Sequence, residues 1–260
     1  MNVDGLDISI LGPACVAGLI VLATHVPLGQ QVLKRGIIFI DLALAQVAAL
    51  GVIGAQFFEL NQNGLVVQLA AAAAALLGAG LLAFTDKHWP RYQEPLIGIL
   101  FALAATGSLL LLANNPHGGE HLKDLLVGQI LWVSFSQLLP AAILSAVLLG
   151  LIGWRRGQLA GLAFYAVFAI AITISVQLVG VYLVFASLII PALATVNLAG
   201  RWRLLAAYGI GIAGYVMGLV LSALFDLPSG AMIVWTLAIA GILAQVIPSL
   251  RRSTAASGEA

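Results

Sequence analysis

The sequence predicts an all-α, polytopic membrane protein with about nine transmembrane helices. Of its 260 residues, 62% are hydrophobic and only 8% are charged, whereas about 25% of the residues of soluble domains are charged. The mean hydropathy is +1.10. The apolar runs are about 20 residues long, which is the length of a membrane-spanning helix. Barrel strands would be shorter and would alternate apolar with polar residues, so we expect a helical bundle.

Nine apolar segments are long enough to be considered as spans. They are Ile8–Val26, Gly36–Phe58, Leu65–Thr85, Pro95–Ala113, Leu125–Gly153, Leu159–Leu178, Val181–Leu198, Leu204–Leu224 and Ala231–Ile247. The fifth is too long for one straight helix, so its first part, Leu125–Ser134, is expected to be a re-entrant or tilted piece that lines a cavity. The sixth and seventh are joined at Val179-Gly180 almost without a loop, which predicts a tight helical hairpin.

The basic residues predict how the chain lies in the membrane, since cytoplasmic loops collect Lys and Arg. If the N-terminus is outside, the basic residues of this chain fall inside with the single exception of Lys123. The inside set is Lys34, Arg35, Lys87, Arg91, Arg155, Arg156, Arg201, Arg203, Arg251 and Arg252. We therefore expect a multi-pass protein with its N-terminus outside and a cytoplasmic C-terminus. The outer loops collect Asp4, Asp7, Glu59, Glu120, Asp124 and Asp226.

One transmembrane domain over residues 1–252 accounts for the chain. Residues 253–260 are small and polar, and we expect them to form a short disordered tail. Membrane lipid is an expected partner. A nucleic-acid partner is not expected, because no basic cluster is long enough to suggest one.

Asp41 is the most informative residue, because it is the only acidic residue deep inside an apolar stretch. A carboxylate at the centre of a membrane helix costs about 2.5–3.5 kcal/mol on insertion scales. Chains that carry this cost usually use the charge on a pathway for ions, protons or polar substrates. The alternative is a protonated Asp that is hydrogen-bonded to a neighbouring helix.

Three other stretches have a structural explanation, and the first of them also has a functional one. Gly180 and Pro191 flank a short apolar run, and a proline late in a span frees a backbone carbonyl that a packing kink or a water-filled cavity must satisfy. The stretch Asp226–Gly230 is typical of a turn that starts a new helix. Glu94 before Pro95 is favourably placed at a helix N-terminus. The GxxxG spacing of Gly214 and Gly218 predicts close helix packing, and packing within the chain is favoured over packing with a second copy.

An outer-loop cluster is another candidate for metal binding. His117, Glu120 and His121 offer imidazole and carboxylate groups that suit zinc, although they are fewer ligands than a closed structural zinc site uses. The chain has no P-loop sequence for ATP and no legible catalytic triad or metalloprotease motif. Catalysis by this chain, and a cofactor bound by it, are therefore not expected.

Five stretches in the same order resemble the permease subunits of ABC importers for zinc, manganese and related metals. They are Lys34-Arg35 followed by Phe39 and Asp41, Glu94 to Phe101, Leu125 to Ser134, Val179 to Ala192, and Asp226 to Val234. The resemblance runs from about Pro27 to Val246. It implies a homodimeric or paired permease in the inner (plasma) membrane that receives a divalent metal as transported substrate from a periplasmic or lipoprotein metal-binding protein. A separate cytoplasmic ABC ATPase would drive transport, and helix rearrangement would alternate access to a cavity near the dimer axis. Asp41 matches an aspartate implicated in the family's metal path.

Two departures from the family pattern affect the expected site. The family usually has a histidine one helical turn after the aspartate, where this chain has Ala45 and then Gln46. Asp41 with Gln46 would favour harder cations or weaker binding. The inner loop around Arg155 and Arg156 lacks a segment that docks on the ATPase in the family, so docking would use the remaining stub or another inner loop, or coupling would be lost.

The sequence thus supports three hypotheses. The first is a permease subunit of an ABC-type zinc, manganese or iron uptake system, with Asp41 and Gln46 on the path and Gly180 and Pro191 as bend points. The second is a permease-derived carrier, passive or proton-linked, that is no longer coupled to ATP. The third is a membrane-embedded assembly subunit without transport.

Overall fold

The structure is a computed structural model that describes residues 8–58, 64–113, 126–128, 130–155 and 159–257. The described part is helical and contains no strand. Its helices are α1 (Ile8–Arg35), α2 (Ile40–Phe57), α3 (Gly64–His88), η2 (Pro90–Tyr92), α4 (Gln93–Leu112), η3 (Ile130–Trp132), α6 (Phe135–Trp154), α7 (Gly161–Val179), α8 (Val181–Ala194), α9 (Gly200–Phe225) and α10 (Ser229–Ser257). The predicted all-α fold class is therefore confirmed.

Eight of these helices in the described part of the chain are long and apolar enough to cross a membrane. Helix α8 is also apolar but has only 14 residues, so the seventh predicted segment ends earlier than expected. Together they agree with a protein of about nine helices that pass into or through the bilayer.

The fifth apolar segment is broken, as its length predicts. A short 3-10 helix, η3, precedes α6, and Gly128 has a positive φ of 70°. Helix α6 begins after Ser134, whose backbone N–H donates to Gln137 Oε1 at 3.0 Å. The side chain of Ser134 and the backbone of residue 137 complete the capping box, which satisfies otherwise unpaired N–H groups at the start of the helix.

Two helix ends differ from the prediction. Helix α1 continues without a break to Arg35, although an inner loop was expected after Val26. Helix α10 continues to Ser257, so residues 253–257, which the composition assigns to a disordered tail, are helical.

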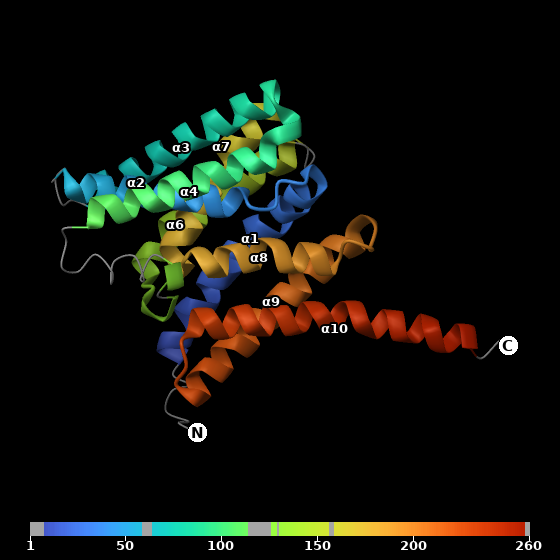
Figure 1. The fold of residues 1–260 in the computed structure, drawn as a ribbon. Coiled ribbons are helices and arrows are strands. Elements are labelled where there is room, and N and C mark those ends of the chain that lie inside the picture. The colour runs from blue at the N-terminus through green and yellow to red at the C-terminus, as the bar shows by residue number, and fades with distance from the viewer. Residues whose placement is uncertain (1–7, 59–63, 114–125, 129, 156–158, 258–260) are drawn as a thin grey trace.

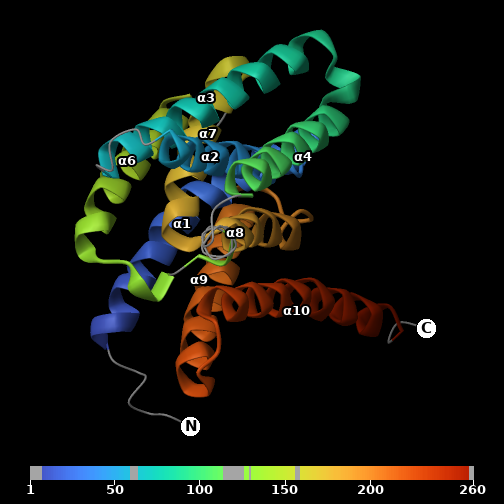
Figure 2. The same ribbon diagram turned by 60° about the vertical axis from the view of Figure 1, so that its left-hand side comes forward.

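The helices form two groups that α1 and α8 connect (Figures 1 and 2). Helix α2 packs against α3, α4 and α7, and α3 also packs against α7. In the second group α10 packs on α9 and on α8. Helix α1 contacts α8 and α9 as well as α6 and α7, and thus bridges the two groups. The C-terminal end of α10 projects from the body in both views.

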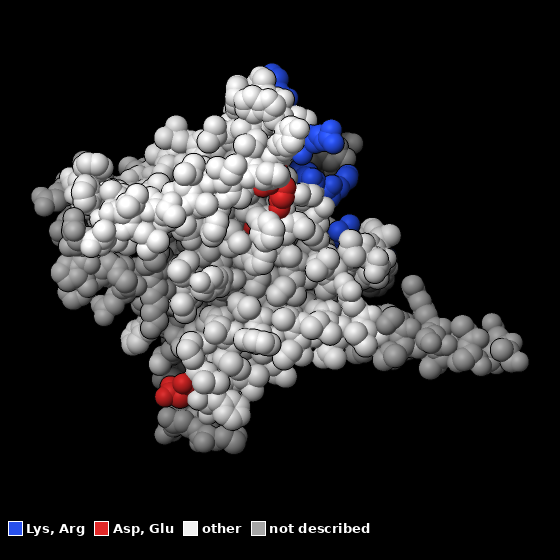
Figure 3. Space-filling view, in the orientation of Figure 1, with Lys and Arg blue, Asp and Glu red and all other residues white. Residues whose placement is uncertain are grey.

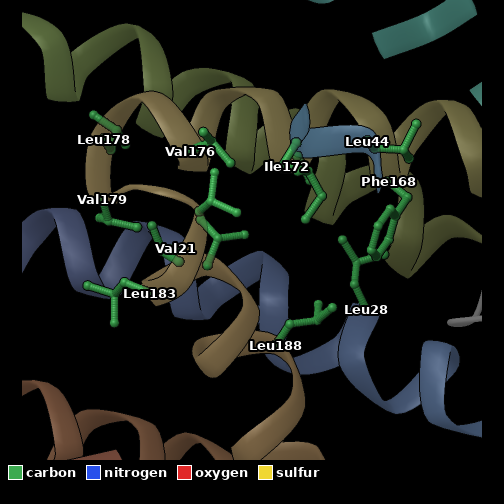
Figure 4. Close-up of a cluster of buried hydrophobic side chains, with 14 of the residues drawn as sticks. Val21, Leu28, Leu44, Phe168, Ile172, Val176, Leu178, Val179, Leu183 and Leu188 are labelled. Atoms are coloured by element: carbon green, nitrogen blue, oxygen red, sulfur yellow. The ribbon is translucent and has the colours of Figure 1, made fainter. Parts of the chain in front are cut away.

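The α7–α8 hairpin forms the centre of the core. Phe168 and Ile172 of α7 pack with Leu44 of α2 and Leu28 of α1, and Leu188 of α8 lies close by (Figure 4). These side chains are fully buried. The hairpin is therefore held on two sides, by α1 and by α2.

Helices α9 and α10 approach closely at the two glycines of the GxxxG spacing. A Cβ atom on Gly214 would lie 2.7 Å from Cγ of Leu237, and one on Gly218 would lie 2.5 Å from Cα of Ile233. Thr236 Oγ1 donates to Gly214 O at 2.7 Å across the same contact. The predicted packing within the chain is confirmed.

The described Lys and Arg side chains gather at one end of the molecule (Figure 3). They come from the C-terminal ends of α1, α3 and α6, from η2, and from the start of α9. We call this the basic end, and we call the end that carries Asp226, after α9, the opposite end.

Candidate functional site

Three of the stretches singled out in the sequence meet at one backbone junction. A Cβ atom on Gly180 would lie 2.6 Å from Cα of Gly128, and one on Gly230 would lie 2.7 Å from the carbonyl oxygen of Val127. The segment Val127-Gly128 therefore lies between the α7–α8 turn and the start of α10. Side chains would prevent this approach, which explains why all three contact positions are glycine.

The two predicted bend points differ in kind. Gly180 has φ 82° and ψ 163°, a backbone conformation that essentially only glycine adopts, and it separates α7 from α8. Pro191 lies inside α8, which ends at Ala194. The carbonyl of Pro191 accepts a hydrogen bond of 2.8 Å from Thr195 Oγ1. Gly180 is thus a sharp turn, and Pro191 lies in the last turn of a short helix.

Asp226 belongs to the turn that the sequence predicts. It has left-handed backbone angles (φ 52°, ψ 47°) and caps the C-terminus of α9, a conformation that Asp tolerates better than most residues. Its side chain is exposed. Ser222 Oγ donates to Leu227 O at 2.6 Å, so the turn is closed by local hydrogen bonds.

Asp41 lies in the first turn of α2, at the basic end. The sequence suggested a position deep in the apolar stretch, and the structure corrects that depth because α2 begins only at Ile40. The side chain is nevertheless 1% exposed. The positive end of a helix dipole favours an anion at this position. Among the described residues, neither oxygen of the carboxyl group has a hydrogen-bond partner.

Glu94 joins the start of α4 to the start of α2. It lies in the first turn of α4, as Glu94-Pro95 predicts. Its Oε1 accepts a hydrogen bond of 3.3 Å from the backbone N–H of Phe39, the residue that precedes α2. Its Oε2 is buried without a hydrogen-bond partner among the described residues.

Gln46 lines a cavity of about 600 Å³ between α2, α4, α8 and α10. The side chain is 4% exposed, and its Oε1 has no hydrogen-bond partner in the described part of the chain. Most of the wall is apolar, and Leu42, Tyr182, Phe185 and Trp235 belong to it. The cavity is therefore a mainly apolar space with few groups that bind ions.

Asp41 and Gln46 do not share this cavity. Asp41 is not among its lining residues. Five residues at 100° per residue separate the two side chains by about 140° around the helix axis. The structure thus gives no support to a site in which α2 alone presents both residues to one ion.

A second, polar cavity of about 280 Å³ lies at the basic end. Among its lining residues are Gly36 and Ile37 from the turn before α2, Arg35 from α1, and Asp86 and Glu94. Gly36 and Ile37, which line the polar cavity, precede Asp41 in the sequence. Leu42 and Gln46, which line the apolar cavity, follow it. In the sequence, Asp41 therefore lies between residues that line the polar cavity and residues that line the apolar cavity.

A hydrogen-bonded group beside the polar cavity was not predicted. Gln93 Nε2 donates to Tyr165 Oη at 3.0 Å and to Leu82 O at 2.9 Å, and Thr85 Oγ1 donates to Gln93 Oε1 at 2.9 Å. These bonds link α3, α4 and α7 at one level. The sequence carries no signal for them, since each residue is an isolated polar side chain at a helix end.

Arg35 fixes the connection between α6 and α7. Its guanidinium group lies 4.0 Å from the centroid of the Phe164 ring and donates to Leu159 O. Arg155, the described part of the predicted docking pair, caps α6 and is exposed. Arg156 lies outside the described residues.

The outer-loop metal candidates His117 and His121 also lie outside the described residues. Within the described part of the chain, no group of three or more His, Cys, Asp or Glu side chains is placed to hold a metal ion. Any site near Asp41 therefore has few protein ligands.

Comparisons with known proteins place the chain in a family. The profile of the ABC 3 transport family matches residues 7–247. A probable iron transport system membrane protein of Haemophilus influenzae is 29% identical over 180 residues, which are 61% of this chain and 65% of the relative, slightly less than two thirds of its length. An uncharacterised membrane protein of Synechocystis is 25% identical over 268 residues, covering 93% of this chain and 92% of the relative.

A solved structure has the same fold. PsaBC from Streptococcus pneumoniae, determined in complex with Fab, superposes with a TM-score of 0.75 and 19% sequence identity. The match covers 96% of this chain and 98% of that chain. The family match runs from the start of α1 into α10 and confirms the resemblance that the five sequence stretches carry. The chain is an integral membrane protein that belongs to the ABC 3 transport family.

Proposed function

We propose that the chain is the permease subunit of an ABC-type uptake system for a divalent metal ion. The observation that carries the proposal is the buried carboxyl group of Asp41, without a hydrogen-bond partner among the described residues, in a chain whose family match covers residues 7–247. The relative from Haemophilus influenzae is named a probable iron transport protein, which supports a metal as cargo. The metal is the transported substrate, and the chain holds no resident cofactor.

The partners follow from this role. A separate cytoplasmic ATPase hydrolyses ATP, because the chain carries no P-loop, and it docks at the basic end near Arg155. A periplasmic or lipoprotein metal-binding protein delivers the ion at the opposite end. A second copy of the chain completes the path, because the cavity lined by Gln46 is mainly apolar and offers too few ligands to guide an ion by itself.

The orientation follows the positive-inside rule. The described basic residues lie at one end of the bundle (Figure 3), and we assign that end to the cytoplasm. The chain then crosses the inner membrane with its N-terminus outside and its C-terminus inside, and the polar cavity at the basic end faces the cytoplasm.

One observation favours a second candidate function. The connection from Trp154 to Gly161 is short, and Arg35 binds it through Leu159 O. A docking surface this small suits a permease-derived carrier, or an assembly subunit, that is not coupled to ATP. Co-purification of an ATPase with the chain separates the importer from both.

The test is the metal content of cells measured by elemental analysis. A strain that lacks the chain is compared with strains restored by wild type, by Asp41→Asn and by the control Asp226→Asn, which removes a carboxylate from an exposed turn. Under limitation of zinc, manganese or iron, one metal falls on deletion, and wild type and Asp226→Asn restore it whereas Asp41→Asn does not. No change in any metal on deletion would remove the proposed function.

A further inference from the structure

A third cavity, of about 360 Å³, lies between α3, α6 and α7. Helix α7 packs against both α3 and α6 and forms the floor between them, and the three helices lie next to one another in Figures 1 and 2. We call this cavity the α3–α6 crevice. It shares no helix with the cavity lined by Gln46, which α2, α4, α8 and α10 form. The crevice therefore belongs to a different face of the bundle from the proposed path.

The opening of the crevice faces the lipid. Leu65 and Leu69 of α3 are 72% and 66% exposed, Leu144 of α6 is 38% exposed, and all three line the crevice. Helices α3 and α6 are both long and apolar enough to cross the membrane. Leucine enters the bilayer core favourably, so leucines that the rest of the chain leaves exposed on such helices contact acyl chains.

The polarity of the crevice changes with depth in the membrane. Its three glutamines, Gln68, Gln137 and Gln177, come from three different helices. Each lies within five residues of the end of its helix that is remote from the basic end. Leu144 and Ile170 line the crevice seven residues further in than Gln137 and Gln177, which is about 10 Å at 1.5 Å per residue. The crevice is thus polar near the membrane surface and apolar at the depth of the acyl chains.

The glutamine amides have unused hydrogen-bonding groups. Gln137 Oε1 accepts hydrogen bonds from the backbone N–H and the hydroxyl of Ser134, at 3.0 and 3.2 Å, which leaves the amide N–H groups of Gln137 for a ligand. The side chains of Gln68 and Gln177 are exposed and make no hydrogen bond within the described part of the chain. Three amide groups at one level can therefore donate to the same polar group.

The deeper part of the crevice offers a ligand no free polar side chain. Thr173 lies there, and its hydroxyl donates to Ala169 O of the same helix at 2.8 Å. Among the described lining residues none is charged. An ion would find no counter-charge in the crevice, whereas a hydrocarbon chain needs none.

We propose that the α3–α6 crevice binds one phospholipid of the leaflet remote from the basic end, which is the outer leaflet in the proposed orientation. The phosphate and ester oxygens accept hydrogen bonds from the glutamine amides, and one acyl chain lies along Leu144 and Ile170. The volume is within the range of about 300–1,000 Å³ that is usual for small-ligand sites. Because no described lining residue is charged, the site does not select the net charge of the headgroup. The bound lipid adds contacts between α3 and α6.

The test is native mass spectrometry of the purified full-length chain, released from detergent after addition of phosphatidylcholine or phosphatidylglycerol. Ala72→Phe blocks the crevice, because Ala72 is half-buried and lines it. Ala73→Phe is the matched control, since the neighbouring Ala73 is exposed and does not line the crevice. The double variant Gln68→Leu/Gln177→Leu removes amides from the polar end, and Gln137 is kept because it caps α6.

We expect wild type and Ala73→Phe to retain one lipid per chain with either headgroup. Ala72→Phe should bind at least tenfold more weakly, and the double glutamine variant at least fivefold more weakly. Lipid retention by Ala72→Phe equal to that of wild type would overturn the proposal. A strong preference for phosphatidylglycerol would overturn the recognition by uncharged amides.

Thermal unfolding in detergent checks that the variants fold and tests the same site independently. Added phosphatidylcholine should raise the unfolding temperature of wild type and of Ala73→Phe, but not that of Ala72→Phe. If Ala72→Phe does not fold, the double glutamine variant decides, because its substitutions are at exposed positions. Equal stabilisation of wild type by a fatty acid, which has no phosphate, would overturn the role of the glutamines. A wild-type chain that binds lipid in this way but carries no metal would leave this inference standing while the proposed function fails.

Discussion

Gly128 and Gly180 meet backbone to backbone. A Cβ atom on Gly128 would lie 2.5 Å from the nitrogen of Gly180, and one on Gly180 would lie 2.6 Å from Cα of Gly128. Both residues have positive φ, 70° and 82°. Two segments more than fifty residues apart in the sequence thus require glycine for the same contact, and this contact holds the α7–α8 turn against the segment before η3.

The first prediction concerns this contact. Gly180→Ala combines a disfavoured backbone conformation, about 1–3 kcal/mol, with overpacking of about 1–3 kcal/mol. We expect a loss of several kcal/mol, measured as reduced thermal stability of the purified protein in detergent. The control is Gly161→Ala, which also has positive φ but no atom within 4 Å of the added Cβ, and should lose only about 1 kcal/mol. Equal losses in the two variants would mean that the contact itself contributes nothing.

The second prediction concerns two glycines of α9 whose substitution by alanine should change the stability of the protein in opposite directions. Gly218→Ala places a Cβ atom 2.5 Å from Cα of Ile233 and should separate α9 from α10, at a cost of about 1–3 kcal/mol. Gly209→Ala meets no atom within 4 Å and should stabilise the helix by about 0.5–1 kcal/mol. Thermal unfolding of both variants tests the pair. Stabilisation by Gly218→Ala would contradict the tight α9–α10 contact.

The third prediction concerns the buried hydrogen bond of 2.8 Å between Ser187 Oγ and Tyr215 Oη. Ser187 Oγ also donates to Leu183 O, so Tyr215→Phe leaves it satisfied and should cost about 1 kcal/mol. Ser187→Ala leaves the buried Tyr215 hydroxyl without its partner among the described residues and should cost about 1–3 kcal/mol. The free energies of unfolding of both single variants and of the double variant, measured by chemical denaturation, show which substitution costs more. A larger loss of stability in Tyr215→Phe than in Ser187→Ala would show that an unsatisfied Tyr215 hydroxyl is not the main cause of the destabilisation.

The fourth prediction concerns Arg35, which joins the end of α1 to the α6–α7 connection. Lysine cannot reproduce both the contact over the Phe164 ring and the planar donor to Leu159 O. We therefore expect Arg35→Lys to destabilise the protein by about 0.5–2 kcal/mol and to expose residues near Leu159 to faster hydrogen exchange. Lys87→Arg, a swap at an exposed residue, should change stability by less than about 0.5 kcal/mol. Unchanged exchange near Leu159 in Arg35→Lys would contradict this role.

The sequence by itself determined the fold class, the approximate number of helices and the family. Long apolar runs and their flanking charges are local properties of the chain, and a bilayer forces such runs to be helical. Three further features were predictable because they also depend on local properties of the sequence. They are the turn at Asp226–Gly230, the break within Leu125–Gly153, and the close packing at Gly214 and Gly218. Each depends on the conformational range of glycine and proline or on the length of a span.

Only the tertiary structure decided which distant groups meet. The start of α2 at Ile40 moved Asp41 from the interior of a span to its first turn, and periodicity alone cannot locate a helix end within an apolar run. The partnership of Glu94 with the α2 N-terminus, the separation of Gln46 from Asp41, and the contact of Gly128 with Gly180 depend on how α4, α8 and the segment before η3 pack. These contacts join residues far apart in the chain, so no local pattern specifies them.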